Sequence, residues 1–199
     1  FTIQDWDVWK KGLVYRCLDR LCSRFAASII ADGAGAARLA ADRQGMDERK
    51  IRVIYDGVDT NELRPSRPRE AVRAELGLAP DRVVVSVIAR VDVRKKGQDV
   101  FLAAARSAAE QAPEAQFLLV GDGPDRGRLE MLAADLPPGA RPVFAGFRTD
   151  LADVIEATDV LVIPSRWESV PKILLEAMWL CRPVVATRVG DIQEVFDER

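Results

Sequence analysis

The sequence predicts an α/β protein built on a doubly wound parallel sheet. From Asp81 onward, strand-like apolar runs alternate with helical segments at a regular pitch, and "RVVVSVIAR" (82–90) is almost wholly apolar. Near-continuous apolar runs are typical of strands that are buried on both faces of a parallel sheet. Regular strand–helix alternation implies right-handed crossovers and a doubly wound order. Ligands of such sheets bind beyond the carboxyl ends of the strands, so the residues after each strand are the candidates for function.

The first 60 residues carry a shorter version of the same alternation. We expect a helix over 7–26, a short strand over 28–31, a helix over 34–44 and a strand over 50–59 that ends in the turn Asp56-Gly57. Residues 60–70 hold two prolines and little that is apolar, which favours a domain boundary. We therefore divide the chain into residues 1–60, a linker over 61–80, and a second domain over 81–199.

The second domain is expected to keep one strand–helix order throughout. Its predicted strands are 82–89, 116–120, 143–145, 159–163 and 183–187, and its predicted helices are 97–111, 125–136, 149–158 and 171–180. Thr149 is a candidate N-cap for the third of these helices. Pro171 suits the first turn of the fourth, where its missing N–H costs nothing.

The composition argues against several classes of protein. The chain has 29 basic and 31 acidic residues, and a net charge of -2 argues against a mainly electrostatic nucleic-acid binder. It has no histidine, and its three cysteines form no C-x-x-C pair, so a zinc site is not expected. Sparse cysteines suit a reducing compartment, and no apolar run approaches the ~20 residues of a membrane-spanning helix. Both ends of the sequence suggest a fragment of a longer protein.

Polar residues and glycines gather after the predicted strands. Arg90 and "VDVRKKG" follow the first strand, Gly121-Asp122-Gly123-Pro124 the second, Phe147-Arg148 the third, and Ser165-Arg166-Trp167-Glu168 the fourth. Cations neutralise phosphates, free N–H groups at a helix start bind anions, and a carboxylate accepts hydrogen bonds from sugar hydroxyls. Together these groups suit a nucleotide diphosphate.

Each of these features also has a purely structural interpretation. A Lys-Lys-Gly run is usually a solvated turn, and Gly-Asp-Gly-Pro is more often a strand-to-helix turn. The next glycine, Gly127, comes one residue too late for the G-x-G-x-x-G fingerprint. Glu176 alone could be a surface carboxylate, but its neighbours are largely apolar, and an unpaired buried carboxylate is costly.

Taken in order, these segments resemble the retaining glycosyltransferases of family four, which have the GT-B architecture. The matching pieces are "VIYDGVD", "ARVDVRKKGQD", "LLVGDGP", "FAGF", "TDVLVIPSRWES", "LLEAM" and "PVVATRVGDIQEV". The resemblance covers residues 26–199, and its most specific part is the spacing of Glu168 and Glu176 followed by Pro-Val-Val-Ala-Thr. GT-B enzymes have two Rossmann-like domains. The resemblance implies that 81–199 is most of the donor domain, incomplete at its C-terminus, and 1–60 the tail of the acceptor domain.

The resemblance also implies a role for each matching residue. Arg90 and Lys96 match the pair that holds the donor diphosphate. Five residues separate them, one more than is commonest in the family, so Lys95 is an alternative to Lys96. Glu168 matches the glutamate beside the transferred sugar, and Glu176 the one that binds the ribose. The remaining donor-binding positions are Gly121, Gly123, Phe147, Arg148, Ser169, Val170, Pro171 and Lys172.

The implied reaction moves a sugar from a nucleotide-diphosphate sugar, such as a UDP- or GDP-sugar, to a hydroxyl of a glycan or lipid-linked acceptor with retention of configuration. No metal, other cofactor or nucleic acid is expected. We expect a cytoplasmic protein, with peripheral membrane association through the part of the acceptor domain outside this sequence, and an inactive isolated fragment. The alternatives are a non-catalytic nucleotide-binding module and a GT-B sugar-nucleotide epimerase or phosphorylase, although we identify no pyridoxal-binding lysine.

Two departures from the family pattern affect the expected packing. Trp179 and Cys181 stand where the family has small residues and glycine, so the corner after the last predicted helix should pack differently. "SIIADGAG" (28–35) lacks the serine that usually follows the last strand of the acceptor domain. A fragment should also expose apolar surface, first on the N-terminal helix at Leu18, Leu21 and Phe25.

Overall fold

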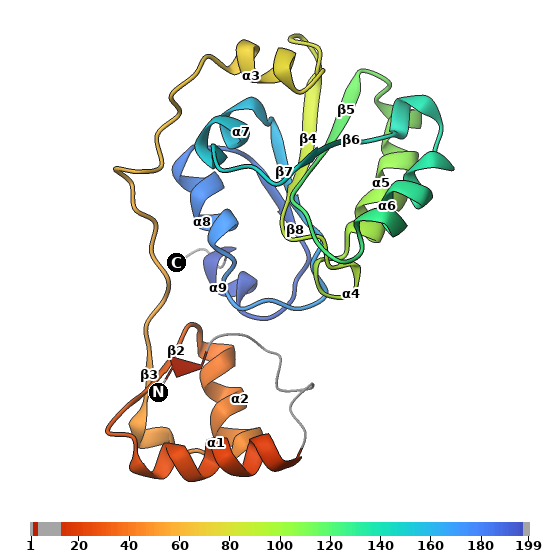
Figure 1. The fold of residues 1–199 in the computed structure, drawn as a ribbon. Helices are drawn as coiled ribbons and strands as arrows, with labels where there is room; N and C mark the ends of the chain where they lie inside the picture. Colours follow the sequence, from red (N-terminus) through yellow and green to blue (C-terminus); the bar gives the residue numbers. More distant parts are fainter. Residues whose placement is uncertain (1, 4–12, 197–199) are drawn as a thin grey trace. The chain divides into compact units, whose positions relative to one another are not determined.

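The computed structural model describes residues 2–3 and 13–196 and divides the chain into two compact units (Figure 1). The larger unit consists of Val58–Arg166 and Lys172–Thr187. The smaller unit consists of Phe1–Gly57 together with two later segments, Trp167–Pro171 and Arg188–Arg199.

The larger unit is built on a five-stranded sheet in which every pairing is parallel. The strands are β4 (Val83–Ile88), β5 (Ala115–Val120), β6 (Val143–Gly146), β7 (Val160–Ile163) and β8 (Val184–Ala186). Their order is β6-β5-β4-β7-β8, so the chain starts in the middle, runs out to one edge and then returns to build the other half. This order is doubly wound, and the predicted fold class is confirmed.

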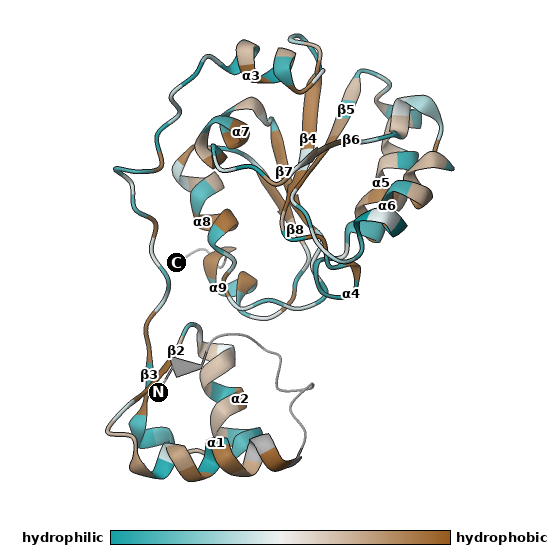
Figure 2. Cartoon of the chain, in the orientation of Figure 1, coloured by the Kyte–Doolittle hydropathy of each residue, from teal (hydrophilic) through white to brown (hydrophobic). Residues whose placement is uncertain are grey.

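The helices of the larger unit lie on both faces of this sheet (Figure 1). They are α3 (Arg69–Glu75), α4 (Val93–Lys96), α5 (Gln98–Gln111), α6 (Arg126–Ala134), α7 (Leu151–Ala157) and α8 (Lys172–Trp179), with the 3-10 helix η3 (Pro138–Ala140). Helices α5 and α6 cover one face and α7 and α8 the other. Because both faces are covered, the central strands are hydrophobic over most of their length (Figure 2). Phe101 of α5 meets Phe117 of β5 edge to face, with the ring centroids 6.1 Å apart.

The segment predicted as a linker is bonded to the larger unit. Arg73 of α3 is buried, and its guanidinium donates to the carbonyls of Ala157, Pro80 and Arg82 at 2.8–3.0 Å and to the Asp159 carboxylate at 2.5 Å. A buried guanidinium is tolerated when its donors are satisfied in this way. We did not predict α3, because the prolines around it suggested a break. Pro68 in fact precedes its first residue, a position compatible with proline.

The helix ends also differ from the sequence expectation. Thr149 does not cap α7, since Asp150 is its N-cap and makes no side-chain cap bond. The Asp150 carboxylate instead accepts two hydrogen bonds from Arg148, at 2.8 and 2.6 Å. The short helix α4 was also not predicted.

The end of α8 explains one departure from the family pattern. The Arg182 N–H donates to the Ala177 carbonyl at 2.8 Å and the Cys181 N–H to the Met178 carbonyl at 3.0 Å, which is the Schellman arrangement. Cys181 therefore occupies the left-handed position, with φ 54°, where glycine is usual. Trp179 is half exposed at this corner, and the expected difference in packing from the family stays a prediction.

The smaller unit contains a three-stranded parallel sheet in the order β1-β2-β3. Its elements are β1 (Thr2–Ile3), α1 (Leu13–Phe25), β2 (Ile29–Ala31), α2 (Ala34–Gln44), the 3-10 helix η2 (Glu48–Lys50), β3 (Ile51–Val53) and α9 (Ile192–Phe196). Helix α2 has the predicted bounds, whereas β3 is shorter than predicted. Residues 7–12 of the predicted first helix lie outside the described residues.

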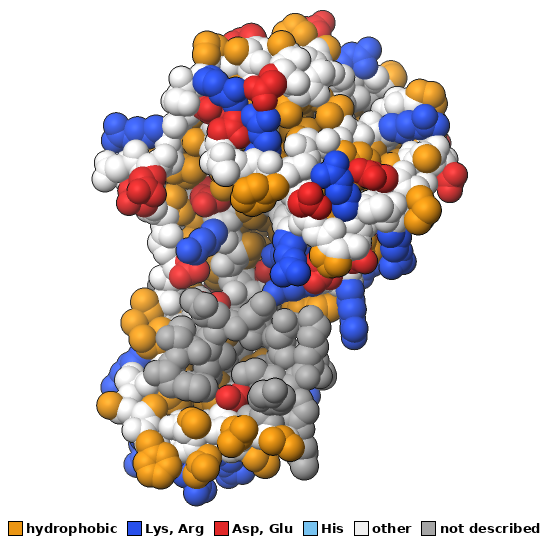
Figure 3. All heavy atoms as spheres, viewed as in Figure 1, with side chains coloured by type: hydrophobic (Ala, Val, Ile, Leu, Met, Phe, Trp, Pro, Cys, Tyr) orange, Lys and Arg blue, Asp and Glu red, His pale blue; other side chains and the backbone are white. Residues whose placement is uncertain are grey.

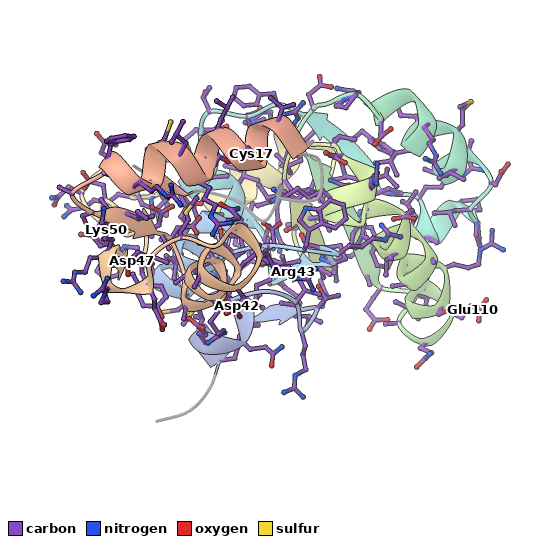
Figure 4. The ribbon with its side chains drawn as sticks, turned by 90° about the horizontal axis from the view of Figure 1, so that it is seen from below. Cys17, Asp42, Arg43, Asp47, Lys50 and Glu110 are labelled. Carbon is purple, nitrogen blue, oxygen red and sulfur yellow. The ribbon has the colours of Figure 1, made fainter. Side chains whose placement is uncertain are left out.

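Helix α1 presents an apolar face to solvent, along the lower edge of Figure 3. Leu18 and Leu21 are each 50% exposed and Phe25 is 85% exposed, which confirms the expectation for this helix. At its C-terminal end, the Lys50 ammonium donates to the carbonyls of Arg24 and Ala26 at 2.7 and 3.0 Å (Lys50 is labelled in Figure 4). A cation there stabilises the helix end. Among the described helices, none is long and apolar enough to cross a membrane.

We predict that Cys181→Gly raises the free energy of unfolding by about 1 kcal/mol, because glycine adopts a left-handed conformation without the steric cost that a Cβ brings. Chemical denaturation of both proteins measures the change. Cys181→Ala is the matched control: it removes the thiol but keeps the Cβ, so it should give no such gain. Equal stabilisation by glycine and alanine would contradict the backbone explanation.

Candidate functional site

A pocket of about 460 Å³ opens in the larger unit beyond the carboxyl ends of its strands. The residues that line it are Ile88, Ala89, Arg90, Val120, Gly121, Asp122, Phe147, Arg148, Leu151, Ile173 and Glu176. It lies where a doubly wound sheet is expected to bind its ligand, at the carboxyl ends of strands next to the switch point between β4 and β7, where the order in which strands are added to the sheet reverses.

The strand register brings the predicted residues together. Ile88 and Val120, the last residues of β4 and β5, are directly paired, so Ala89 and Gly121 leave the sheet at the same level and Arg90 is the next residue along its loop. Strand β6 ends at Gly146 and continues into Phe147 and Arg148. Five predicted positions therefore meet in one pocket: Arg90, Gly121, Phe147, Arg148 and Glu176.

The loops after β4 and β5 are in direct backbone contact. A Cβ on Gly121 would lie 1.9 Å from the Ala89 carbonyl oxygen, and the φ of Gly121 is +131°. The Val91 N–H donates to the Asp122 carbonyl at 2.9 Å. Gly123, which is not among the residues lining the pocket, would likewise place a Cβ 2.2 Å from the Val91 carbonyl oxygen. These two glycines are explained by close packing of the loops.

The loop that carries Lys95 and Lys96 forms α4. The Asp92 carboxylate caps this short helix by accepting from the Lys95 N–H at 3.1 Å, and Gly97 ends it in a left-handed conformation. The buried Gln98 side chain donates to the Arg90 carbonyl at 2.8 Å, which fixes the start of the loop. Both lysines lie outside the residues that line the pocket, so the choice between them stays a prediction.

Arg166 fixes the other side of the same loop. Its N–H donates to the Lys95 carbonyl at 2.8 Å, and its guanidinium donates to the Val93 carbonyl at 2.7 Å and to the Asp99 carboxylate. The Arg166 side chain lowers the pKa of Asp99. The backbone around the two lysines is thus held by hydrogen bonds from α5 and from the loop after β7, which favours a preorganised anion site.

Phe147 and Arg148 form one end of the pocket. Phe147 is 75% exposed, so its ring is available for stacking against a ligand. The Arg148 guanidinium is bonded to two carboxylates, those of Asp150 and Glu75, at 2.6–2.8 Å. Two hydrogen bonds raise the pKa of Arg148: the larger effect comes from the bond with Asp150 and the smaller from the bond with Glu75. Because its charge is already paired, Arg148 shapes this end of the pocket more than it attracts an anion.

Glu176 projects from α8 toward the pocket, one turn after Ile173. Burial raises the pKa of its carboxyl, and the nearby Lys172 partly opposes this effect. No described residue forms a hydrogen bond or ion pair with this carboxylate. A half-buried acceptor of this kind is suited to the hydroxyl groups of a ligand.

The loop between β7 and α8 carries the remaining predicted residues. Its residues 168–171 belong to the smaller unit, and Lys172 is exposed at the start of α8. Glu168 is buried, and Gly190 packs so closely against its carbonyl that a Cβ would lie 1.7 Å away. Val170 and Pro171 are buried as well. The Ser169 hydroxyl donates to the Asp32 carboxylate at 2.9 Å.

Asp191 is a further buried carboxylate of the smaller unit that sequence reasoning missed. It caps α2, because its oxygens accept from the N–H groups of Gly35 at 2.7 Å and Ala36 at 3.4 Å. Burial raises the pKa of Asp191, and the bond from Gly35 works against this. One sequence signal was available: α2 begins at "GAGAA", which supplies no capping side chain of its own.

The apolar lining of the pocket was also missed. Ile88 and Val120 are the last residues of their strands, and Leu151 and Ile173 lie in the first turns of α7 and α8. Their place at element ends was the available signal. In the described part of the chain, no group of three or more acidic or cysteine side chains is placed to hold a metal ion.

Comparison with known proteins gives a family match and individual relatives. Residues 82–199 match the model of the family described as "Glycosyl transferases group 1". The putative glycosyltransferase EpsF of Bacillus subtilis is 27% identical over 170 residues, which is 85% of this chain and 44% of EpsF. A D-inositol 3-phosphate glycosyltransferase of Mycobacterium tuberculosis is 35% identical over 163 residues, 78% of this chain and 33% of that protein. The chain thus spans less than half the length of these curated relatives.

A solved structure agrees with the sequence comparison. The crystal structure of Anabaena Alr3699/HepE in complex with UDP-glucose superposes with a TM-score of 0.85 at 27% sequence identity. The match covers 99% of this chain and 55% of that one. The five-stranded parallel sheet and its helices therefore match a nucleotide-sugar-bound structure of the GT-B type.

We predict that Glu176→Gln stabilises the folded protein at neutral pH. Because the pKa of Glu176 is raised above 4.5 in the folded state, ionising it costs the native state stability, and a neutral glutamine removes that cost. The gain should shrink as the pH falls through the raised pKa toward 4.5. Denaturant titrations at pH 7 and near pH 4.5 measure it. A variant less stable than the original protein at pH 7 would contradict the assignment of Glu176 as a residue kept for a ligand.

Proposed function

Because this chain belongs to the Glycosyl transferases group 1 family, we propose that it forms the donor-binding part of a retaining glycosyltransferase. The proposed reaction moves a sugar from a nucleotide-diphosphate sugar to an acceptor hydroxyl. The observation that carries the proposal is the pocket that joins Arg90, Phe147 and Glu176 at the carboxyl ends of a doubly wound sheet.

The pocket offers a different chemistry to each part of a nucleotide. The exposed Phe147 ring and the apolar residues beside it suit a nucleobase. The Glu176 carboxylate is suited to accept hydrogen bonds from adjacent ribose hydroxyls. Arg90 supplies the positive charge that a diphosphate needs, and a guanidinium can bind it with two hydrogen bonds.

Catalysis would rest on charges that are fixed before the reaction. Negative charge grows on the diphosphate as its bond to the sugar breaks, and Arg90 with Lys96, or Lys95 in its place, would stabilise that charge. Two cations at the phosphates would make the reaction independent of a metal. Glu168 would lie beside the transferred sugar, and the backbone of 169–172 would face the sugar and phosphate.

The donor and acceptor classes are further parts of the proposal. HepE binds UDP-glucose, which makes UDP-sugars the first donors to examine, with GDP-sugars as the second choice. A glycan or lipid-linked hydroxyl would be the acceptor. A cytoplasmic enzyme that acts at the membrane surface would be suited to such acceptors.

We predict that Arg90→Ala weakens binding of UDP at least tenfold while leaving the affinity for uridine unchanged, since losing a hydrogen bond to a charged group costs about 1.5–3 kcal/mol. Isothermal titration calorimetry with UDP and uridine measures both values. The same pair of ligands applied to Lys95→Ala and Lys96→Ala shows which lysine binds the diphosphate.

Arg128→Ala is the matched control for the charge. Arg128 is exposed on α6 and is not among the residues that line the pocket, so its loss should leave both affinities unchanged. If both variants lost the same UDP affinity, Arg90 would act only through the net charge of the protein and not through a direct contact with the diphosphate. An original protein that binds neither UDP nor GDP would overturn the proposed function.

We predict that the transferred sugar keeps the anomeric configuration of the donor. In a reaction of UDP-glucose and a glycan acceptor with a protein that carries this chain together with an acceptor domain, proton NMR of the product should show the α-linkage that the donor carries. An inverted product would refute the retaining mechanism while leaving donor binding intact.

A further inference from the structure

The short helix α4 carries both lysines that are candidates for the diphosphate, and it consists of only four residues, Val93–Lys96. Isolated helices shorter than about 12–15 residues are marginal in water, and most helical stability in proteins comes from tertiary contacts. The positions of Lys95 and Lys96 therefore depend on the residues that hold α4 from outside.

Arg166, in the loop after β7, bonds to α4 at two of its carbonyl groups. The Arg166 N–H donates to the Lys95 carbonyl at 2.8 Å, and the Arg166 guanidinium donates to the Val93 carbonyl at 2.7 Å. The start of α4 is held from another loop, since the Val93 N–H donates to the Asp125 carboxylate at 2.8 Å. Only the bond to the Val93 carbonyl needs the arginine side chain, so a substitution of Arg166 removes that bond and keeps the backbone one.

Asp99, in the first turn of α5, fixes the guanidinium that bonds to α4. Its two oxygens accept from two nitrogens of Arg166, each at 2.8 Å, which is the bidentate geometry. The pair is partly exposed, with 40% of the Arg166 side chain and 30% of the Asp99 side chain accessible, and pairs of this kind contribute little to stability. The effect of the pair is therefore orientation: it directs the guanidinium toward the Val93 carbonyl.

The backbone of the loop after β7 also contacts the end of α4. Gly97 ends this helix, and a Cβ on Gly97 would lie 2.0 Å from the Pro164 carbonyl oxygen. Arg166, Asp99 and the whole of α4 belong to the larger unit, as do the residues that line the pocket. One compact unit therefore contains both the lysines and the residues that hold them.

We propose that Arg166 and Asp99 are positioning residues for the diphosphate: they hold the backbone of α4, and with it the lysine that binds the phosphates. The role rests on the proposed function, because it needs a diphosphate bound by Lys95 or Lys96. A loop that is ordered before the ligand arrives lowers the entropy cost of binding, so loss of either positioning residue weakens the complex.

Asp99→Asn separates positioning from net charge, because the two explanations predict opposite signs. Removing a negative charge favours an anion if charge alone matters, whereas loss of the bidentate pair loosens α4. We expect the Kd of the full chain for UDP to rise about fivefold in Asp99→Asn and in Arg166→Ala, the equivalent of about 1 kcal/mol. The Kd for uridine should stay unchanged, which also shows that the variants are folded. Calorimetry measures both, with GDP and guanosine as the pair if the chain binds GDP.

Glu110→Gln is the matched control for Asp99→Asn. Glu110 is exposed in the last turn of the same helix, α5, so this variant makes the same change of charge without touching Arg166. It should not weaken UDP binding. An unchanged or tighter UDP complex in Asp99→Asn would overturn the positioning role, and so would an equal loss of affinity for UDP and uridine.

Combined variants show whether Arg166 acts through a lysine. Once the lysine that binds the diphosphate is replaced by alanine, Arg166→Ala should cause no further loss of UDP affinity, because the group that it positions is gone. A full further loss in both the Lys95→Ala and the Lys96→Ala backgrounds would show that Arg166 acts independently of them and would overturn the proposal. An original chain that binds neither UDP nor GDP would instead refute the proposed function on which this role rests.

Discussion

The contact between the backbones of the loops after β4 and β5 is the constraint on which the pocket depends. Gly121 lies so close to the Ala89 carbonyl that any side chain would collide with it, and Val91 is bonded to the Asp122 carbonyl. This contact holds Arg90 beside the end of β5, and parallel pairing sets the level at which both loops leave the sheet. The backbone that carries Arg90 is therefore fixed before any ligand arrives, as a preorganised site requires.

A set of ion pairs joins separate elements of the larger unit. Arg67 and Arg148 share the carboxylates of Glu75 and Asp150, so the segment before β4 is tied to the end of the pocket formed by Phe147 and Arg148. Exposed ion pairs contribute little singly, but this closed set orients Arg148. Glu176 contrasts with these residues, since no described residue pairs with it and burial raises its pKa. A half-buried carboxylate without such a partner is suited to the hydroxyl groups of a ligand.

The smaller unit divides two tasks between two aspartates. Asp191 is buried and caps α2, where the N-terminal N–H groups and the helix dipole favour a carboxylate. Because Asp191 caps the helix, Asp32 is not needed as a cap, and it accepts a hydrogen bond from the Ser169 hydroxyl. The side chain that stabilises the helix therefore comes from the end of the described chain, and not from the aspartate next to the helix in sequence.

The sequence by itself determined the fold class, because apolar strands in regular alternation with helices have few ways to bury both faces of a sheet. It also indicated Arg90, Gly121, Phe147 and Glu176, since residues after parallel strands, or on the helix that follows, meet at one edge. Only the tertiary structure decided how Asp32, Asp191 and the segment around Arg73 are used. Their partners lie 137, 156 and up to 86 residues away, and no local pattern encodes a hydrogen bond across such separations.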